Sequence, residues 1–396
     1  MVAPVTTANH ASMVKRTLTA LLALFLVATA APAAASGAQP GTLVSATPTT
    51  LYLAPLVPLP AKAWRVVYAS RTATGEPVQV SGVVLAPSGA YPGDRPLIGY
   101  APGTQGLDTR CAASRMLSQG TEYEAPFIAR MLAKGWAVAV PDYQGLGTPG
   151  SHPYVVGEAL GRQTLDIVRA ARALPGAVLS ATGPVGIYGY SEGGEAAGAA
   201  IEQQPSYAPD IPLTGAAVGA APADFQSVIK ARDGSVMMFL ILYALSGFGT
   251  AYPELKVDSY LNATGRDAMA GYRRSCIVDA IATSVPQSHR LSSYVTTNPL
   301  EQPAVKARMA ENNLGARAPA TEVLVGNARN DEVIPFDVMH NLYRQWCGLG
   351  VNARFDDIPL LDHFTGLPVF ANHAIDFLAQ RFAGAPLPRA RDCAAA

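Results

Sequence analysis

Residues 186–194 read GIYGYSEGG, a serine between glycines directly after a short apolar run. The apolar run is typical of a buried strand, and the alanine-rich segment that follows it is typical of a helix. Three interpretations of Ser191 compete: the N-cap of an ordinary strand-to-helix turn, part of a phosphate-binding glycine loop, and a nucleophile on a tight elbow. No G-x-x-x-x-G-K-[ST] or G-x-G-x-x-G arrangement fits the segment, which excludes the phosphate loop.

The pentapeptide 189–193 fits G-x-S-x-G, the pattern of a nucleophile elbow. Side chains two residues on either side of the serine would collide across so sharp a turn, and glycine avoids the collision. The turn exposes Ser191 at the top of a sheet and directs the N–H of Glu192 toward the reacting oxygen. The positive end of the following helix also favours an oxyanion. We therefore predict a nucleophile, with the ordinary turn as the alternative.

A serine nucleophile requires a base, and an acid that orients the base. On elbows of this kind the acid follows the serine in the chain and the histidine follows the acid. Asp331 lies in a loop directly after the apolar run 323–325 and is the predicted acid. A solvated loop carboxylate is the alternative interpretation. Four other acidic residues are considered for the role of Asp331, but they lie less directly at the end of a strand: Glu332, Asp337, Asp356 and Asp357.

Four histidines follow the serine, and His363 is the predicted base. It lies in LLDHFTG, just beyond a predicted strand and just before a glycine turn. His289 lies in the predicted cap, residues 222–318. His340 and His373 fall within predicted helices, where we expect structural roles. His152 precedes the serine, so we expect it to be a structural loop residue.

A second oxyanion donor is expected in the loop after an early strand. The segment YAPGTQGLDTRC (100–111) has glycines that allow backbone N–H groups to approach a substrate. We predict Gln105 as this donor, with Thr104 as the next candidate and a purely structural glycine turn as the alternative.

Strand and helix patterns alternate along most of the chain, after a hairpin within 63–89. This alternation predicts an α/β protein with a mostly parallel sheet and helices on both faces. It stops between 222 and 318, where only helical pieces and polar connectors occur. We predict a core of residues 36–221 and 319–396, and a mainly helical cap of residues 222–318 over the carboxyl ends of the strands.

The predicted cap contains VMMFLILYALSGFG (236–249), an apolar stretch too short to span a bilayer. Two interpretations remain open. The stretch is either a buried core helix or the lining for an acyl chain, as part of a lid that opens at a lipid surface.

The N-terminus has the layout of a secretory signal. Lys15 and Arg16 precede an apolar segment, 18–30, and small residues follow at 33–35. The apolar segment is well short of the roughly 20 residues of a membrane-spanning helix. We therefore predict a signal peptide over residues 1–35 and an extracellular or periplasmic protein.

Composition bears on the class of protein, its partners, its disulfides and its metal sites. The chain has 29 basic and 29 acidic residues, 49% hydrophobic residues and 15% charged residues, which indicates a globular protein with a large core. A net charge of 0 gives no reason to expect a nucleic-acid partner. Four cysteines in a secreted chain favour disulfides, and the three possible pairings stay open. We predict no metal site, because no Cys/His cluster has ligand spacing.

Four motifs in order resemble the secretory lipase family, the fungal lipase A type and its bacterial relatives: GYSEGG, YAPGTQGLDTRCAAS, RNDEVIPF and LLDHFTG. The resemblance runs from about residue 50 to the C-terminus. It implies an α/β-hydrolase fold with a lid, no cofactor, and hydrolysis of carboxylic esters including acylglycerols. It also implies a Ser191–Asp331–His363 triad, Glu192 as an oxyanion donor, and the disulfides Cys111–Cys276 and Cys347–Cys393.

The expected function is therefore a serine ester hydrolase that acts as a monomer on a small-molecule or lipid ester, with its cap in transient contact with a lipid surface. One alternative is a secreted serine peptidase on the same fold, but no acidic pocket for a substrate amine is recognisable. The other is a non-catalytic lipid-binding protein, although all three triad positions are occupied.

Overall fold

The computed structural model describes residues 37–284, 290–388, 390 and 393. The predicted signal peptide, residues 1–35, and His289 lie outside the described residues.

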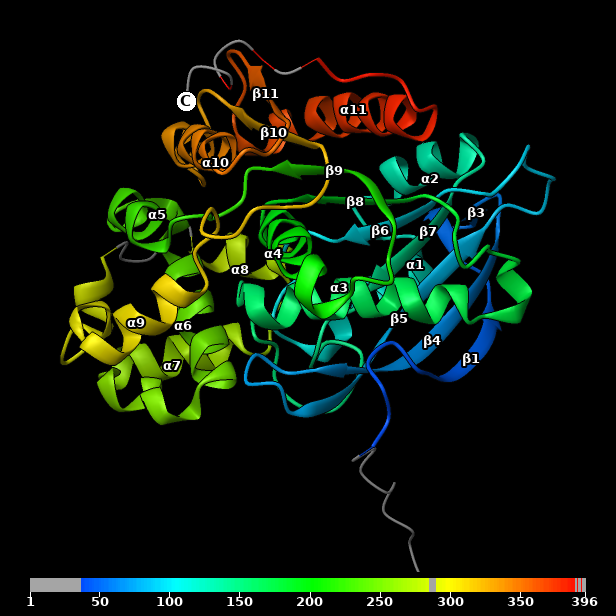
Figure 1. The fold of residues 1–396 in the computed structure, drawn as a ribbon. Helices are drawn as coiled ribbons and strands as arrows, with labels where there is room; N and C mark the ends of the chain where they lie inside the picture. Colours follow the sequence, from blue (N-terminus) through cyan, green and yellow to red (C-terminus); the bar gives the residue numbers. More distant parts are fainter. Residues whose placement is uncertain (1–36, 285–289, 389, 391–392, 394–396) are drawn as a thin grey trace, which may run out of the picture. The chain divides into compact units, whose positions relative to one another are not determined.

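Nine strands of the described chain form one sheet in the order β1-β4-β5-β7-β6-β8-β9-β10-β11 (Figure 1). The strands are β1 Leu43–Thr49, β4 Lys62–Arg71, β5 Pro77–Ala86, β6 Leu97–Ala101, β7 Ala137–Pro141, β8 Val185–Tyr190, β9 Leu213–Gly219, β10 Val323–Ala328 and β11 Ala353–Ile358. Pairing is antiparallel from β1 to β7 and parallel from β7 to β11. Two short strands, β2 Tyr52–Ala54 and β3 Val57–Pro58, pair separately.

Helices cover both faces of this sheet. The helices of the described chain are α1 Ala113–Gln119, α2 Ala125–Ala133, α3 Gly157–Arg172, α4 Glu192–Tyr207, α5 Phe225–Arg232, α6 Phe239–Ala251, α7 Ala263–Tyr272, α8 Ile277–Ser284, α9 Pro303–Glu311, α10 Phe336–Gly348 and α11 His363–Phe382. Helices α2 and α11 lie on one face and α3 and α4 on the other (Figure 1). The mostly parallel sheet between two helical layers confirms the predicted fold class.

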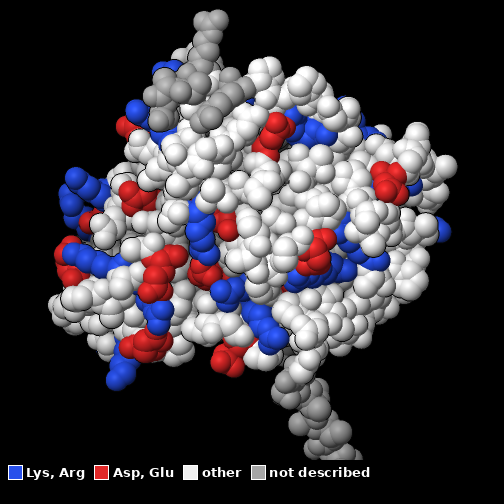
Figure 2. Space-filling view, viewed as in Figure 1, with Lys and Arg blue, Asp and Glu red and all other residues white. Residues whose placement is uncertain are grey.

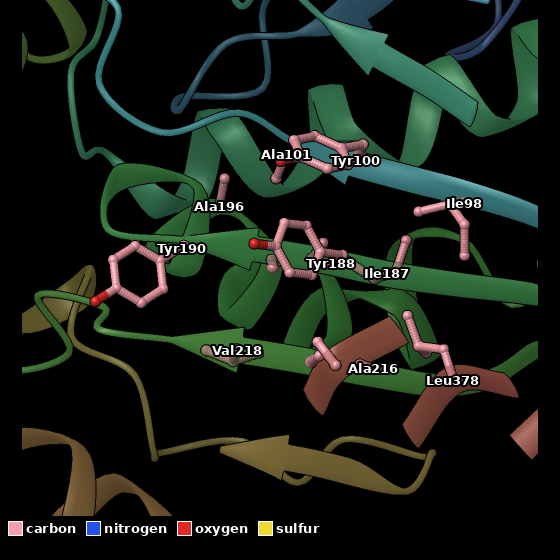
Figure 3. Packing of buried hydrophobic residues seen from close by; sticks show 14 of the residues in the cluster. Ile98, Tyr100, Ala101, Ile187, Tyr188, Tyr190, Ala196, Ala216, Val218 and Leu378 are labelled. Carbon is pink, nitrogen blue, oxygen red and sulfur yellow. The ribbon is translucent and has the colours of Figure 1, made fainter. Parts of the chain in front are cut away.

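The central parallel strands β6, β8 and β10 are mainly apolar because helices bury both of their faces. Every residue of β6, β8 and β10 is buried. Figure 3 shows the result around β8, where Ile187 and Tyr188 pack among side chains of β6, β9 and α11. This rigid core positions the loops that follow the strands.

Helices α5 to α9 all lie between β9 and β10, in the segment predicted as a cap. They share an apolar cluster that includes Phe239, Leu242 and Val305. No single helix of the described chain is long and apolar enough to cross a membrane. Val236–Ala251 and Pro253–Tyr260, bent by 115° relative to each other, reach that length and composition only as a pair.

The final helix begins earlier than the sequence pattern indicated. We expected His363 in a loop, but it is the first residue of α11. Asp362 accepts a hydrogen bond from the N–H of Thr365 at 2.7 Å, and the Thr365 hydroxyl accepts one from the N–H of Asp362 at 3.1 Å. This reciprocal capping box starts the helix, and Gly366 lies inside the helix rather than ending it.

Strand β1 is a second difference, because the sequence analysis predicted no strand there. It is an edge strand paired only with β4, and most of its residues are exposed. Its sequence, LVSATPT, therefore lacks the apolar run by which the buried strands were recognised.

The two disulfides are Cys111–Cys276 and Cys347–Cys393, the pairing that the resemblance implied. The first joins the segment after β6 to the start of α8. The second joins the end of α10 to the C-terminal segment.

Acidic and basic side chains are interspersed on the face in Figure 2, and most of that face is uncharged. This distribution follows from equal numbers of basic and acidic residues and a charged fraction of 15%.

Candidate active site

The carboxyl ends of the parallel strands bring the predicted site residues to one edge of the sheet. Ser191 directly follows β8, Asp331 follows β10, and His363 follows β11. The loop 102–106 leaves β6, the neighbour of β8. Open α/β sheets place their ligands at this edge.

Ser191 lies on a sharp turn with a strained backbone. Its φ of 60° and ψ of −124° are rare for any residue other than glycine. A Cβ atom at Gly189 would lie 1.9 Å from the carbonyl oxygen of Gly193, and one at Gly193 would lie 2.1 Å from that of Ala101. The Ser191 side chain makes no capping hydrogen bond to α4, so the ordinary N-cap interpretation does not describe it.

Ser191, His363 and Asp331 form one continuous chain of hydrogen bonds. The Ser191 Oγ lies 3.0 Å from Nε2 of His363, and Nδ1 of His363 lies 2.8 Å from Oδ2 of Asp331. The other oxygen of Asp331 accepts the N–H groups of Val333 and Ile334 at 2.8 and 2.6 Å. Asp331 and His363 are only 7% and 6% exposed. The loop thus holds the carboxylate rigidly toward the imidazole.

Two residues that the sequence analysis did not select hold His363 in place. Glu332 accepts the N–H of His363 at 2.9 Å, and Tyr190 donates its hydroxyl to the His363 carbonyl at 2.9 Å. Burial raises the pKa of Tyr190 far above its usual range, so the phenol stays a neutral donor. The place of Tyr190 beside Ser191 in the motif was the signal that could have identified it. Glu332 was considered only as a rival to Asp331.

The other candidate histidines lie in different surroundings. His340 stacks on Phe336, and Nδ1 of His373 lies 2.9 Å from a carboxylate oxygen of Asp356. His152 lies closer to the site than the sequence indicated. Its Nε2 lies 2.6 Å from a side-chain oxygen of Glu192, and both side chains are buried.

The loop 102–106 presents Thr104 rather than Gln105 to the site. Gln105 donates its side-chain amide to Glu122 at 3.1 Å and to the Gly103 carbonyl at 3.2 Å. Its own carbonyl accepts the N–H of Ile277 at 2.9 Å. Gln105 is therefore directed away, whereas Thr104 lines the same cavity as Ser191. These contacts involve the side chain and the carbonyl of Gln105, so the predicted role of its backbone N–H as oxyanion donor stays a prediction.

Two cavities meet at Ser191. The larger, of about 320 Å³, also contains His363, and the smaller, of about 50 Å³, also contains Glu192. Residues from the predicted cap line the larger one and are mostly apolar: Met237, Phe239, Leu240, Ile277, Val278 and Ile281. Helix α6 therefore fits both interpretations of 236–249, since most of it is buried and its first turn lines the cavity.

The described residues contain no group of three or more His, Cys, Asp or Glu side chains that could hold a metal ion.

Residues 111–389 match the family described as secretory lipase. A probable inactive lipase of Mycobacterium tuberculosis is 28% identical over 370 residues, which cover 90% of this chain and 81% of the relative. A secreted triacylglycerol lipase of Malassezia furfur is 29% identical over 336 residues, which cover 79% of this chain and 85% of the relative.

Two solved structures have a similar fold. Candida antarctica lipase A superposes with a TM-score of 0.79 at 20% identity, covering 90% of this chain and 85% of that one. The rice cell wall degrading esterase LipA of Xanthomonas oryzae gives 0.73 at 21% identity, covering 87% and 98%. The family description and the secreted relative also confirm the predicted secretion. The chain belongs to the secretory lipase family and has the α/β-hydrolase fold.

Proposed function

We propose that this protein is a serine ester hydrolase that cleaves carboxylic esters, including acylglycerols, through an acyl-enzyme on Ser191. One observation carries the proposal. The chain of hydrogen bonds from Ser191 through His363 to Asp331, at 3.0 and 2.8 Å, opens into an apolar cavity. A hydroxyl with a base in contact and an oriented acid behind that base is the arrangement that activates a serine.

In the proposed reaction Ser191 attacks the acyl carbonyl while His363 accepts the hydroxyl proton. Asp331 stabilises the imidazolium that forms. The backbone N–H groups of Glu192 and Thr104 hold the tetrahedral oxyanion, Thr104 taking the role first assigned to Gln105. His363 then protonates the leaving alcohol, and water attacks the acyl-enzyme to release the acid.

Residues 222–318 act as the cap in this proposal. The apolar side chains of α6 and α8 that line the larger cavity favour an ester or acyl substrate over a charged one. The names of the relatives point both ways, since one is a triacylglycerol lipase and another a probable inactive lipase. Activity is expected here because Ser191, Asp331 and His363 are all present and in contact.

The direct test is hydrolysis of p-nitrophenyl butyrate by the wild type and by Ser191→Ala. We expect wild-type turnover and a loss of at least about 1,000-fold in the variant. A fluorophosphonate probe should label the wild type and leave the variant unlabelled. Equal rates for the two proteins, together with no labelling, would contradict the hydrolase proposal and favour a non-catalytic lipid-binding protein.

A further inference from the structure

Two buried carboxyl groups lie beside the loop 102–106 and have no part in the proposed triad chemistry. Glu122 and Glu124, in the connection between α1 and α2, are 4% and 1% exposed. Glu124 lines the larger cavity together with Ser191 and Thr104. Among the described residues, no Lys, Arg or His forms an ion pair with either carboxyl.

Hydrogen bonds that these carboxyls accept hold the loop on both sides of Thr104. Glu124 accepts the N–H of Gly103 at 2.8 Å on one oxygen and the hydroxyl of Tyr100 at 3.0 Å on the other. Glu122 accepts the side-chain amide of Gln105 at 3.1 Å and the N–H of Glu124 at 3.2 Å. Tyr100 itself is fixed in β6, beside Tyr188 of β8 (Figure 3).

We propose that Glu122 and Glu124 together position the Thr104 N–H as oxyanion donor, and that Glu124 must be neutral for full activity. The inference rests on the proposed function, because it concerns the oxyanion site of that reaction. Both glutamates are positioning residues that act through the loop.

The surroundings favour a proton on this pair. The second oxygen of Glu122 is buried and has no hydrogen-bond partner among the described residues, which is costly for an ionised carboxylate. Burial, opposed in part by hydrogen bonds, raises the pKa of Glu122 to about 7. Burial and the charge of Glu122 raise the pKa of Glu124 to about 8. At pH 7 Glu124 is therefore mostly protonated.

The groups that face the pair from neighbouring elements do not supply a compensating positive charge. The charge of Asp142, after β7, raises the pKa of Glu122, and that of Glu192, in α4, raises the pKa of Glu124. The adjacent buried phenols have pKa values raised well above their usual range by burial, so they stay neutral: Tyr100, Tyr154 and Tyr188.

A neutral Glu124 keeps every contact that the loop needs. One oxygen still accepts the N–H of Gly103 at 2.8 Å, and the other stays in contact with the Tyr100 hydroxyl at 3.0 Å. An ionised Glu124 adds negative charge to the cavity wall where the oxyanion develops. Like charges in a water-poor site repel strongly, so ionisation opposes the transition state more than the bound ester.

The experiment compares kcat and KM for butyrate ester hydrolysis between pH 6 and 10 in the wild type, Glu124→Gln and Glu124→Leu. We expect wild-type kcat to fall about tenfold above a midpoint near pH 8, with KM little changed. Gln mimics the protonated acid, since its oxygen accepts from Gly103 and its amide donates to Tyr100. The Gln variant should retain most of the activity and lose the alkaline fall. The Leu variant, without either contact, should lose about 100-fold in kcat at every pH.

Glu195→Gln is the matched control. Glu195 is also fully buried with a raised pKa, its oxygens have no hydrogen-bond partners among the described residues, and it does not line the larger cavity. The control should keep the alkaline fall of the wild type. An alkaline fall that persists in Glu124→Gln overturns the inference, as does a Gln variant as impaired as the Leu variant. If the Leu variant does not fold, the Gln profile still decides. Failure of the proposed function looks different, because the wild type would then hydrolyse no ester at any pH.

Discussion

At the scale of single residues, backbone sterics at the elbow determine what the serine can do. Ser191 has a left-handed backbone because the chain must turn from β8 into α4 without side chains at positions 189 and 193. The strain leaves the hydroxyl free of the helix cap and within 3.0 Å of His363. Strain of this kind persists only where the surrounding structure enforces it, and here the packed strands and α4 do so.

A methyl group added at the elbow should therefore lower activity and stability far more than a methyl group added at an unconstrained glycine. In Gly193→Ala the new Cβ would meet the Ala101 carbonyl oxygen at 2.1 Å, so β6 and α4 must move apart. We expect esterase activity to fall at least tenfold and the free energy of unfolding to fall by about 2 kcal/mol. Gly271→Ala in α7 is the control, since nothing lies within 4 Å of its Cβ position. Enzyme kinetics and urea unfolding measure activity and stability in the two variants. Equal losses in Gly193→Ala and Gly271→Ala would mean that the elbow is not sterically constrained.

At the scale of elements, the site is assembled from segments that meet only in the folded chain. Loop 102–106 contacts the start of α8 through the 2.9 Å hydrogen bond from the N–H of Ile277 to the Gln105 carbonyl, and the Cys111–Cys276 disulfide ties the segment just after the loop to the same place. Side chains of α8 in turn line the larger cavity. One wall of the cavity and the proposed oxyanion loop are therefore mechanically coupled.

Removing this disulfide should affect substrate binding as well as stability. In the double variant Cys111→Ser/Cys276→Ser we expect a loss of about 2–4 kcal/mol in unfolding free energy and a KM raised severalfold, because α8 is less firmly held. The double variant Cys347→Ser/Cys393→Ser loses a disulfide away from the cavity residues and should lose stability with KM unchanged. Identical KM values for the two double variants would contradict the coupling.

At the scale of the whole molecule, a set of buried acids should shape the pH dependence of stability. Burial is the largest cause of a raised pKa at each of these groups: Glu122, Glu124, Asp142, Asp166, Glu195 and Glu202. In the unfolded chain their pKa values return to about 4. Between about pH 4.5 and 8 the folded state therefore binds more protons than the unfolded state, and stability must fall as pH rises.

The free energy of unfolding should fall by roughly 1 kcal/mol per pH unit for each extra proton that the folded state binds relative to the unfolded state. The contribution is fully present below the unfolded-state pKa and is lost as the pH passes the raised values, about 6 for Asp166 and about 8 for Glu124. Urea unfolding at pH 5, 6.5 and 8 should show a steady decrease. Glu124→Gln should show a smaller decrease than the wild type. A stability that rises from pH 5 to 8 would contradict this assignment of buried protons.

The sequence by itself determined the fold class, the family, and the meeting of Ser191, Asp331 and His363. These features are local or ordered along the chain: apolar runs form strands, glycines permit the elbow, and parallel strands bring their ends to one edge. Only the tertiary structure decided that Thr104 faces the cavity, that His363 begins a helix, and that Glu122 and Glu124 flank the loop. Those outcomes depend on which groups become buried together. Packing between distant segments sets hydrogen-bond partners and protonation, and a linear pattern of residue types carries no record of that packing.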